Sequence, residues 1–242
     1  KNQVGREIPD EILARMGKTG YRGLHDRDNA SYRKASPTVR ALNDPQRGKL
    51  CASLREALEK CELHDGMYFG FHHHFRDGDY VINMVMQEVA RMGIRDITIC
   101  ASSLGKAHDP IVPYIEDGTI TNIIIGSKGK IGEAISKGKF KKPAIIRSHG
   151  GRVRAIEEGD IHLDVAFIGA PTADEYGNAR AVGGKSDCGV LSYSMADAKY
   201  ADHVVVVPDC LVDFPNMPAS VEAIDVDAVV VVDSIGNPKK IA

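Results

Sequence analysis

The chain has 242 residues and a formal net charge of -2, with 43% hydrophobic and 26% charged residues. This composition is ordinary for a globular protein and lacks the basic excess that predicts nucleic-acid binding. No apolar run approaches the roughly 18 residues of a membrane-spanning helix, so we expect no membrane segment.

The five cysteines are widely spaced and form no CxxC pair. This pattern argues against a zinc ribbon or a disulfide framework and predicts free thiols in a reducing cytoplasm. The sequence begins at Lys1, without an initiator Met and without the apolar stretch of a secretory signal. We therefore expect a cytoplasmic protein and a sequence that is part of a longer chain.

Residues 1–43 are polar and rich in turn-forming residues, and we expect them to form an extended arm. Ordered structure is predicted to begin at Asp44-Pro45, because Asp caps helices and Pro is favoured in the first turn. Apolar residues then recur every three or four positions and predict one helix. These residues are Leu50, Leu54, Leu58 and Cys61.

Short apolar runs then alternate with helical patterns. Strands are predicted at residues 67–71, 97–100, 120–125, 144–146, 165–169, 203–207 and 228–232. Helices are predicted at residues 80–92 and 131–135. Several strand runs are apolar at every position, which is typical of strands buried on both faces of a parallel sheet. We therefore predict a three-layer α/β domain over residues 44–242, with a mostly parallel sheet flanked by helices and binding loops at the carboxyl ends of its strands.

The first candidate loop follows the first strand of this series and contains His72, His73, His74 and Arg76. Imidazoles and a guanidinium before a helix can bind an anionic substrate. The histidines can instead bond to the loop backbone or hold a metal ion. Adjacent residues of an extended chain point to opposite sides, and no HExxH spacing is present. We therefore predict substrate binding and no metal.

A second candidate loop spans residues 147–154. Gly150 and Gly151 would let the backbone approach a ligand and expose its N–H groups, next to His149. Arg152 can pair with a carboxylate through two hydrogen bonds. The alternative is a tight turn with a solvated basic rim.

A third candidate is the polar turn after the predicted strand at 165–169, where Gly177 and Asn178 favour a positive φ. We include Asn178 among the predicted binding residues. Glu175 in the same turn is expected to be solvated, as most glutamates are.

Two further patterns are weaker. The sequence GGKS at residues 183–186 lacks the GxxxxGK(S/T) spacing of a triphosphate loop, so we exclude that site. Lysines gathered between residues 128 and 142 predict either a solvated face or a docking site for an acidic partner or for phosphates.

Four motifs, FHHHFR at 71–76, RSHGGRVRAIE at 147–157, DEYGN at 174–178 and DAKYAD at 197–202, resemble those of the citrate lyase alpha chain family. More distantly, the domain is similar to the first half of CoA-transferases and to sugar-phosphate isomerases. Histidines stand at residues 72–74 where the wider CoA-transferase family has glycines.

The resemblance implies the reaction of such alpha chains, which exchange acetyl for citrate on the thioester of an acyl carrier protein and release acetate. It also implies a CoA-like prosthetic group on that carrier, a beta chain that cleaves the citryl thioester, and an oligomeric complex. Backbone N–H groups at Gly150 and Gly151, with Arg and His side chains, would hold the tricarboxylate beside the thioester.

In CoA-transferases the site lies between two similar halves, and the reactive glutamate of covalent members belongs to the second half. The resemblance therefore implies that this chain is the first half, and we assign no catalytic residue. Replacing Arg152 or His149 with Ala should abolish exchange without loss of folding. The alternative function is a sensor or effector domain of the same fold that binds a small anion without catalysis, because a fold does not fix a function.

Overall fold

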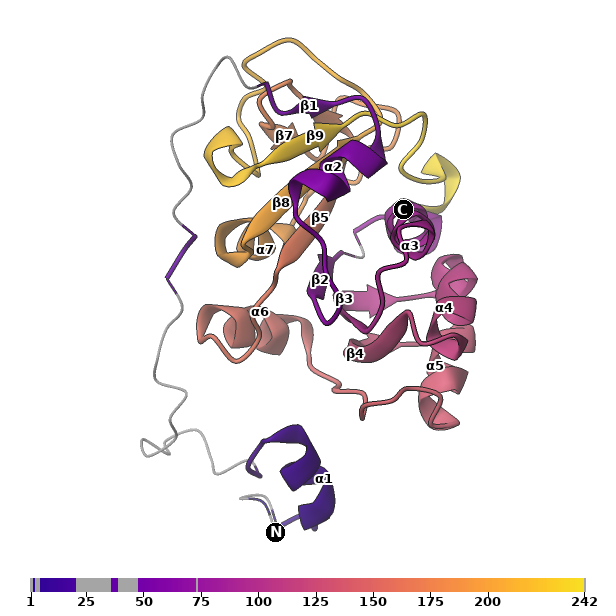
Figure 1. The fold of residues 1–242 in the computed structure, drawn as a ribbon. Coiled ribbons are helices and arrows are strands. Elements are labelled where there is room, and N and C mark those ends of the chain that lie inside the picture. The colour runs from indigo at the N-terminus through magenta and orange to yellow at the C-terminus, as the bar shows by residue number, and fades with distance from the viewer. Residues whose placement is uncertain (1, 3–4, 21–35, 39–47, 73, 242) are drawn as a thin grey trace.

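The computed structural model describes residues 2, 5–20, 36–38, 48–72 and 74–241. Its centre is a seven-stranded sheet (Figure 1). The spatial order of the strands is β1 (Leu50–Cys51), β9 (Ala228–Val230), β8 (His203–Pro208), β5 (Val165–Ala170), β2 (Tyr68–Phe71), β3 (Ile97–Leu104) and β4 (Ile120–Ser127). Every neighbouring pair is parallel, which confirms the prediction from the fully apolar runs.

Helices cover both faces of the sheet. One face carries α2 (Leu54–Lys60), α3 (Val81–Arg91), α4 (Val112–Glu116) and α5 (Gly129–Ser136), and the other carries α6 (His149–Glu157) and α7 (Ser194–Tyr200). Strand β8 divides its side chains between the two cores: Val205 and Val207 pack in the first, and Val204 and Val206 pack in the second. The architecture is therefore three-layer α/β.

Helix α3 shows why the sequence pattern succeeds in this part of the chain. Its apolar side chains recur on one face and are buried, while the Asp79 carboxylate accepts a hydrogen bond from the Val81 N–H at 2.9 Å. Gly93, with φ of 76°, ends the helical path in a left-handed conformation. Helix α5 likewise confirms the shorter predicted helix.

Smaller elements lie outside the seven-stranded sheet. The hairpin of β6 (Thr172–Ala173) and β7 (Ala179–Arg180) follows β5. The 3-10 turns are η3 (Arg76–Gly78), η4 (Lys106–Ile111), η5 (Ala223–Asp225) and η6 (Pro238–Lys240). Among the described residues, no helix combines the length and the apolar character needed to cross a membrane.

The first predicted helix begins later than expected. Leu50 and Cys51 form strand β1, which pairs with β9, so these residues are not part of the helix. Ser53 caps α2, because its side chain accepts a hydrogen bond from the Glu56 N–H at 3.2 Å. The predicted start at Asp44-Pro45 lies outside the described residues.

The predicted strand at 144–146 is wrong. Only Ile145 forms a bridge, to Ile124 of β4, and Ile146 is 68% exposed. The next helix, α6, begins only three residues later, with Ser148 as its cap. Because α6 packs on the opposite face of the sheet from α5, the chain cannot continue along the edge beside β4.

The N-terminal segment is not uniformly extended. Helix α1 (Asp10–Met16) lies within it, and Gly17 ends that helix with φ of 60°. Thr38 binds the domain near the end of α7: its N–H donates to the Lys199 carbonyl at 2.8 Å and its hydroxyl to the Ala201 carbonyl at 2.9 Å. The domain boundary at residue 44 stays a prediction.

Candidate functional site

A pocket of about 540 Å³ lies at the carboxyl edge of the sheet, where the sequence predicted binding loops. His72, His74 and Arg76 line it from the loop after β2. His149 lines it from the first turn of α6, and the loop at 187–193 completes much of the wall. This volume is typical of small-molecule sites.

Four of the predicted binding residues therefore meet at one pocket, although they come from separate parts of the sequence: His72, His74, Arg76 and His149. His73 lies outside the described residues. Gly150, Gly151, Arg152 and Asn178 do not line the pocket. Their binding roles stay predictions, because the structure places each of them outside the residues that line this pocket.

The two described histidines of the first loop are held in a neutral state. Burial, together with the positive charge of Arg152, lowers the pKa of His72 well below its ordinary value. Burial also lowers the pKa of His74, against the opposing effects of Asp79 and the Gly169 carbonyl. Their rings stack with centroids 5.8 Å apart. At neutral pH this part of the pocket therefore offers uncharged imidazoles.

Arg152 is a buried structural residue. Its side chain is 2% exposed and forms two hydrogen bonds with the Asp197 carboxylate of α7, the first at 2.7 Å. The same guanidinium donates to the Cys100 carbonyl of β3 at 3.1 Å. Arg152 therefore pairs with a carboxylate of the chain itself, and its predicted binding of a substrate carboxylate stays a prediction.

The segment at 147–154 is mainly a helix, contrary to the loop that we predicted. The Ser148 hydroxyl accepts a hydrogen bond from the Gly151 N–H at 3.1 Å and caps α6, so Gly150 and Gly151 lie in its first turn. The other two arginines pair on the surface: Arg147 with Asp160, and Arg154 with Glu158.

Replacing Gly150 with Ala should stabilise the chain slightly. A Cβ at this position would meet nothing within 4 Å, and Ala is the better helix former by about 0.5–1 kcal/mol. Urea unfolding measures the change in free energy. Gly151→Ala is the matched comparison, because its Cβ would lie 2.8 Å from the Ser148 hydroxyl that caps the helix. A gain at Gly151 equal to that at Gly150 would contradict the helical geometry.

Residues 47–242 match the protein family described as citrate lyase, alpha subunit (CitF). The chain belongs to this family. The citrate lyase alpha chain of Klebsiella pneumoniae is 45% identical over 207 residues, which are 85% of this chain and 41% of the relative. The chain thus spans about two fifths of the length of this curated relative.

Two solved structures have folds similar to that of this citrate lyase family member. A Streptococcus mutans protein, described as an alpha subunit of citrate lyase in complex with citrate, is 48% identical with a TM-score of 0.88, over 99% of this chain and 46% of that chain. Glutaconate CoA-transferase from Acidaminococcus fermentans has a TM-score of 0.55 at 16% identity, over 76% of this chain and 75% of that chain. The second likeness concerns the fold alone and confirms a CoA-transferase-like architecture.

Asn178 holds the turn between β6 and β7 in this member of the citrate lyase family. Its amide donates to Asp174 at 2.8 Å, and its side-chain oxygen accepts from the Ala223 N–H at 2.9 Å. Asn216 donates to its backbone carbonyl at 3.0 Å. Glu175 in the same turn is exposed, as expected.

Sequence reasoning missed the loop at 187–193 and three further lining residues, Ser102, Pro238 and Ile241. The loop begins just after the GGKS sequence that we excluded as a triphosphate loop. Ser186 ties it to the end of β8 by donating to the buried Asp209 carboxylate at 2.6 Å, and the Gly184 N–H donates to Asp187 at 2.8 Å. The available signal was length, because long irregular loops inside compact domains are often functional.

Two residues of the pocket have an uncommon backbone conformation. Arg76 and Ser192 each have φ of 50°, in the left-handed region that non-glycine residues rarely adopt. Such conformations cost free energy and cluster at functional sites. Glu62 and Asp96, away from the pocket, have the same conformation, so it does not by itself mark the site.

The gathered lysines fit the solvated alternative. All of them are exposed, and three pair with nearby carboxylates: Lys137 with Glu133, Lys139 with Glu116, and Lys142 with Asp96. A docking role stays a prediction.

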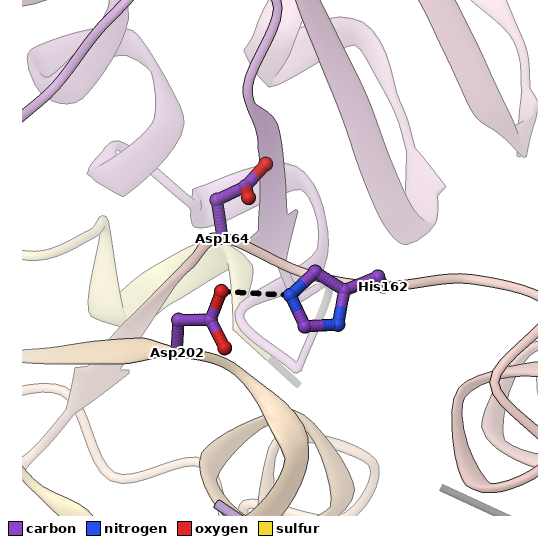
Figure 2. A group of neighbouring side chains, drawn as sticks. All are labelled: His162, Asp164 and Asp202. Atoms are coloured by element: carbon purple, nitrogen blue, oxygen red, sulfur yellow. Dashed lines mark hydrogen bonds and ion pairs between the residues drawn. The ribbon is translucent and has the colours of Figure 1, made fainter.

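A second ionisable cluster lies at the opposite, amino edge of the sheet (Figure 2). One ligand atom each from His162, Asp164 and Asp202 lies within 4.8 Å of the others, a spacing that could hold a metal ion. The His162 ring bonds to Asp202 at 2.7 Å, and Asp164 accepts from the Tyr68 N–H at 2.6 Å. These bonds join the starts of β5, β8 and β2, and they account for the cluster structurally.

Proposed function

We propose that this chain forms part of the site at which a citrate lyase alpha subunit transfers an acyl-carrier thioester from acetyl to citrate. The products are citryl-carrier and acetate. The observation that carries the proposal is the pocket lined by histidines and Arg76 at the carboxyl edge of a chain of this family. The S. mutans protein, similar over 99% of this chain and solved with citrate, adds support.

The lining residues suit a polycarboxylate. Arg76 supplies a fixed positive charge that can pair with a carboxylate in a bidentate way. His149 stands in the first turn of α6, where the positive end of the helix dipole favours an anion. The neutral His72 and His74 add hydrogen-bonding atoms without a further charge. Together these groups bind and orient a substrate.

The remaining parts of the reaction belong to other molecules or segments. The thioester is carried by the CoA-type prosthetic group of an acyl carrier chain, and a beta chain consumes the citryl product. The catalytic group comes from a second α/β half of a longer alpha chain, with the site between the halves. An oligomeric complex in the cytoplasm completes this proposal.

Replacing His149 with Ala should slow the exchange at least tenfold, because the variant removes a pocket side chain at the helix terminus. The assay uses the full-length alpha subunit with its acetylated carrier and measures the release of labelled acetate on addition of citrate. His162→Ala is the matched control, since it removes an exposed imidazole at the opposite edge.

Equal rates in the two variants would place the reaction away from this pocket. A full-length protein that binds citrate but never releases acetate from its carrier would overturn the transferase proposal. That result would favour the sensor alternative.

A further inference from the structure

A second cavity, which we call the lysine cavity, lies beside the histidine-lined pocket and has a volume of about 460 Å³. Its lining residues are Asp77, Lys106, Ala107 and Lys240. Three parts of the chain each contribute one residue to the pocket and a nearby residue to this cavity. The pairs are Arg76 with Asp77, Ser102 with Lys106, and Ile241 with Lys240. The two cavities are therefore neighbours.

Backbone contacts hold two walls of the lysine cavity together. The Asn237 N–H donates to the Gly78 carbonyl at 2.8 Å, and the Tyr80 N–H donates to the Ile235 carbonyl at 3.0 Å. Gly78 permits this approach, because a Cβ there would lie 2.7 Å from the Asn237 carbonyl oxygen. The turn η3, which carries Asp77, is thus joined to the segment that leads into η6 and Lys240.

The two lysines of the cavity differ from the other surface lysines. Lys106 and Lys240 are exposed, and within the described residues neither forms an ion pair. Lys137, Lys139 and Lys142, by contrast, each pair with a carboxylate. Two ammonium groups that line one cavity without a counter-ion favour the binding of an anion there.

Asp77 is the acidic residue of the cavity wall, and a third lysine partly offsets its charge. A Cβ at Gly105 would lie 2.6 Å from Oδ1 of Asp77 and 3.5 Å from Cε of Lys128, so both side chains approach the same point of the wall. The charges of Lys106 and Lys240 are then left for a ligand. An anion in the cavity would still be repelled by Asp77, which supplies a test of opposite sign.

We propose that the lysine cavity binds the phosphate groups of the CoA-type carrier whose thioester reacts in the adjoining pocket. Lysine ammonium groups are common binding partners of phosphate. A CoA-type group carries its phosphates at one end of a flexible arm and its sulfur at the other end. A basic cavity next to the pocket suits these two ends. The inference rests on the proposed function, because it takes the thioester to react in the pocket.

The first test compares phosphopantetheine with pantetheine, which has the same thiol arm and no phosphate. Calorimetry on the full-length alpha subunit should show phosphopantetheine binding about tenfold more tightly, the effect of one or two charge-assisted contacts. Replacing both Lys106 and Lys240 with Gln should reduce this preference to about twofold or less. Asp77→Asn should increase the preference, because it removes the repelling charge.

Lys137→Gln is the matched control for the double variant. It removes an exposed lysine that pairs with Glu133 and does not line the cavity, so the preference should not change. Citrate binding should also be unchanged in all of these variants, since none of them alters a residue that lines the pocket.

The exchange reaction separates the carrier from free pantetheine compounds. In the double variant the KM for the acetylated carrier should rise while kcat stays the same, because the lysines bind the carrier and do not touch the reacting atoms. An unchanged KM, together with weaker phosphopantetheine binding, would overturn the assignment of the cavity to the carrier.

Equal affinities for phosphopantetheine and pantetheine in the unmodified protein would overturn the inference while leaving citrate exchange intact. A double variant that behaves like Lys137→Gln would overturn it as well, and so would an Asp77→Asn variant with a reduced preference. If the unmodified protein releases no acetate from its carrier, the proposed function fails, whereas the phosphopantetheine comparison still tests the cavity itself.

Discussion

Replacing Arg152 with Ala is expected to destabilise the chain by about 3–5 kcal/mol, because it leaves the fully buried Asp197 carboxylate without its partner. Small domains have a total free energy of unfolding of about 5–15 kcal/mol, so this loss would unfold a large fraction of the molecules in a chain of low stability. Urea unfolding followed by circular dichroism measures the loss. Sequence analysis predicted lost exchange without lost folding for this variant, and the burial of Arg152 reverses the second part.

Arg154→Ala is the matched control in the same helix. The Arg154 side chain is 65% exposed and its ion pair with Glu158 lies on the surface, so the change should be within about 0.5 kcal/mol. An Arg152 variant as stable as the Arg154 variant would mean that the Arg152–Asp197 pair does not form as described.

Gly184→Ala should have the second large effect, about 3 kcal/mol of destabilisation or a displaced pocket loop. A Cβ at this position would lie 2.1 Å from the carbonyl oxygen of Pro171, which is backbone and has little freedom to move. Gly184 lies two residues before Ser186 and three before the pocket wall at 187–193. Thermal unfolding measures the stability, and citrate calorimetry on the full-length protein measures the pocket.

Gly126→Ala provides the comparison for this variant. Gly126 lies in strand β4, and a Cβ there would meet no atom within 4 Å. The Gly126 variant should unfold at a temperature close to that of the unmodified protein. If Gly184→Ala unfolds at the same temperature as Gly126→Ala and binds citrate normally, the close approach to Pro171 is wrong.

Much of the fold could be predicted because the decisive signals are local. A run such as 204–207, apolar at every position, has no polar face to turn to solvent, so it belongs inside a parallel sheet. The apolar residues of α3 recur every three or four positions, and this local spacing predicts the helix equally well. Leu50 misled us because its spacing also continues the stripe of α2, while its real partner, Val229 of β9, is distant in sequence.

The site was harder to predict because long-range contacts decide what each polar side chain does. The residues next to Arg152 in the sequence do not reveal that its guanidinium is paired with Asp197. Asp197 lies on α7, a helix that sequence analysis did not predict. The consecutive glycines at 150 and 151 are typical of turns, so the sequence predicted a loop there and not a helix capped by Ser148. His72 and His74 do line the pocket, because a loop that follows β2 lies at the carboxyl edge of the sheet, and substrate binding by them stays a prediction.

The pairing of β1 with β9 has a consequence for the order of synthesis. Among the described strands, β1 is the first to leave the ribosome and pairs only with β9, at the sheet edge, so that edge cannot close until residue 230 has emerged. The central strands β2 and β3 are near neighbours in sequence and can pair much earlier. During translation β1 is therefore an unpaired edge, the kind of segment that invites premature association with other chains.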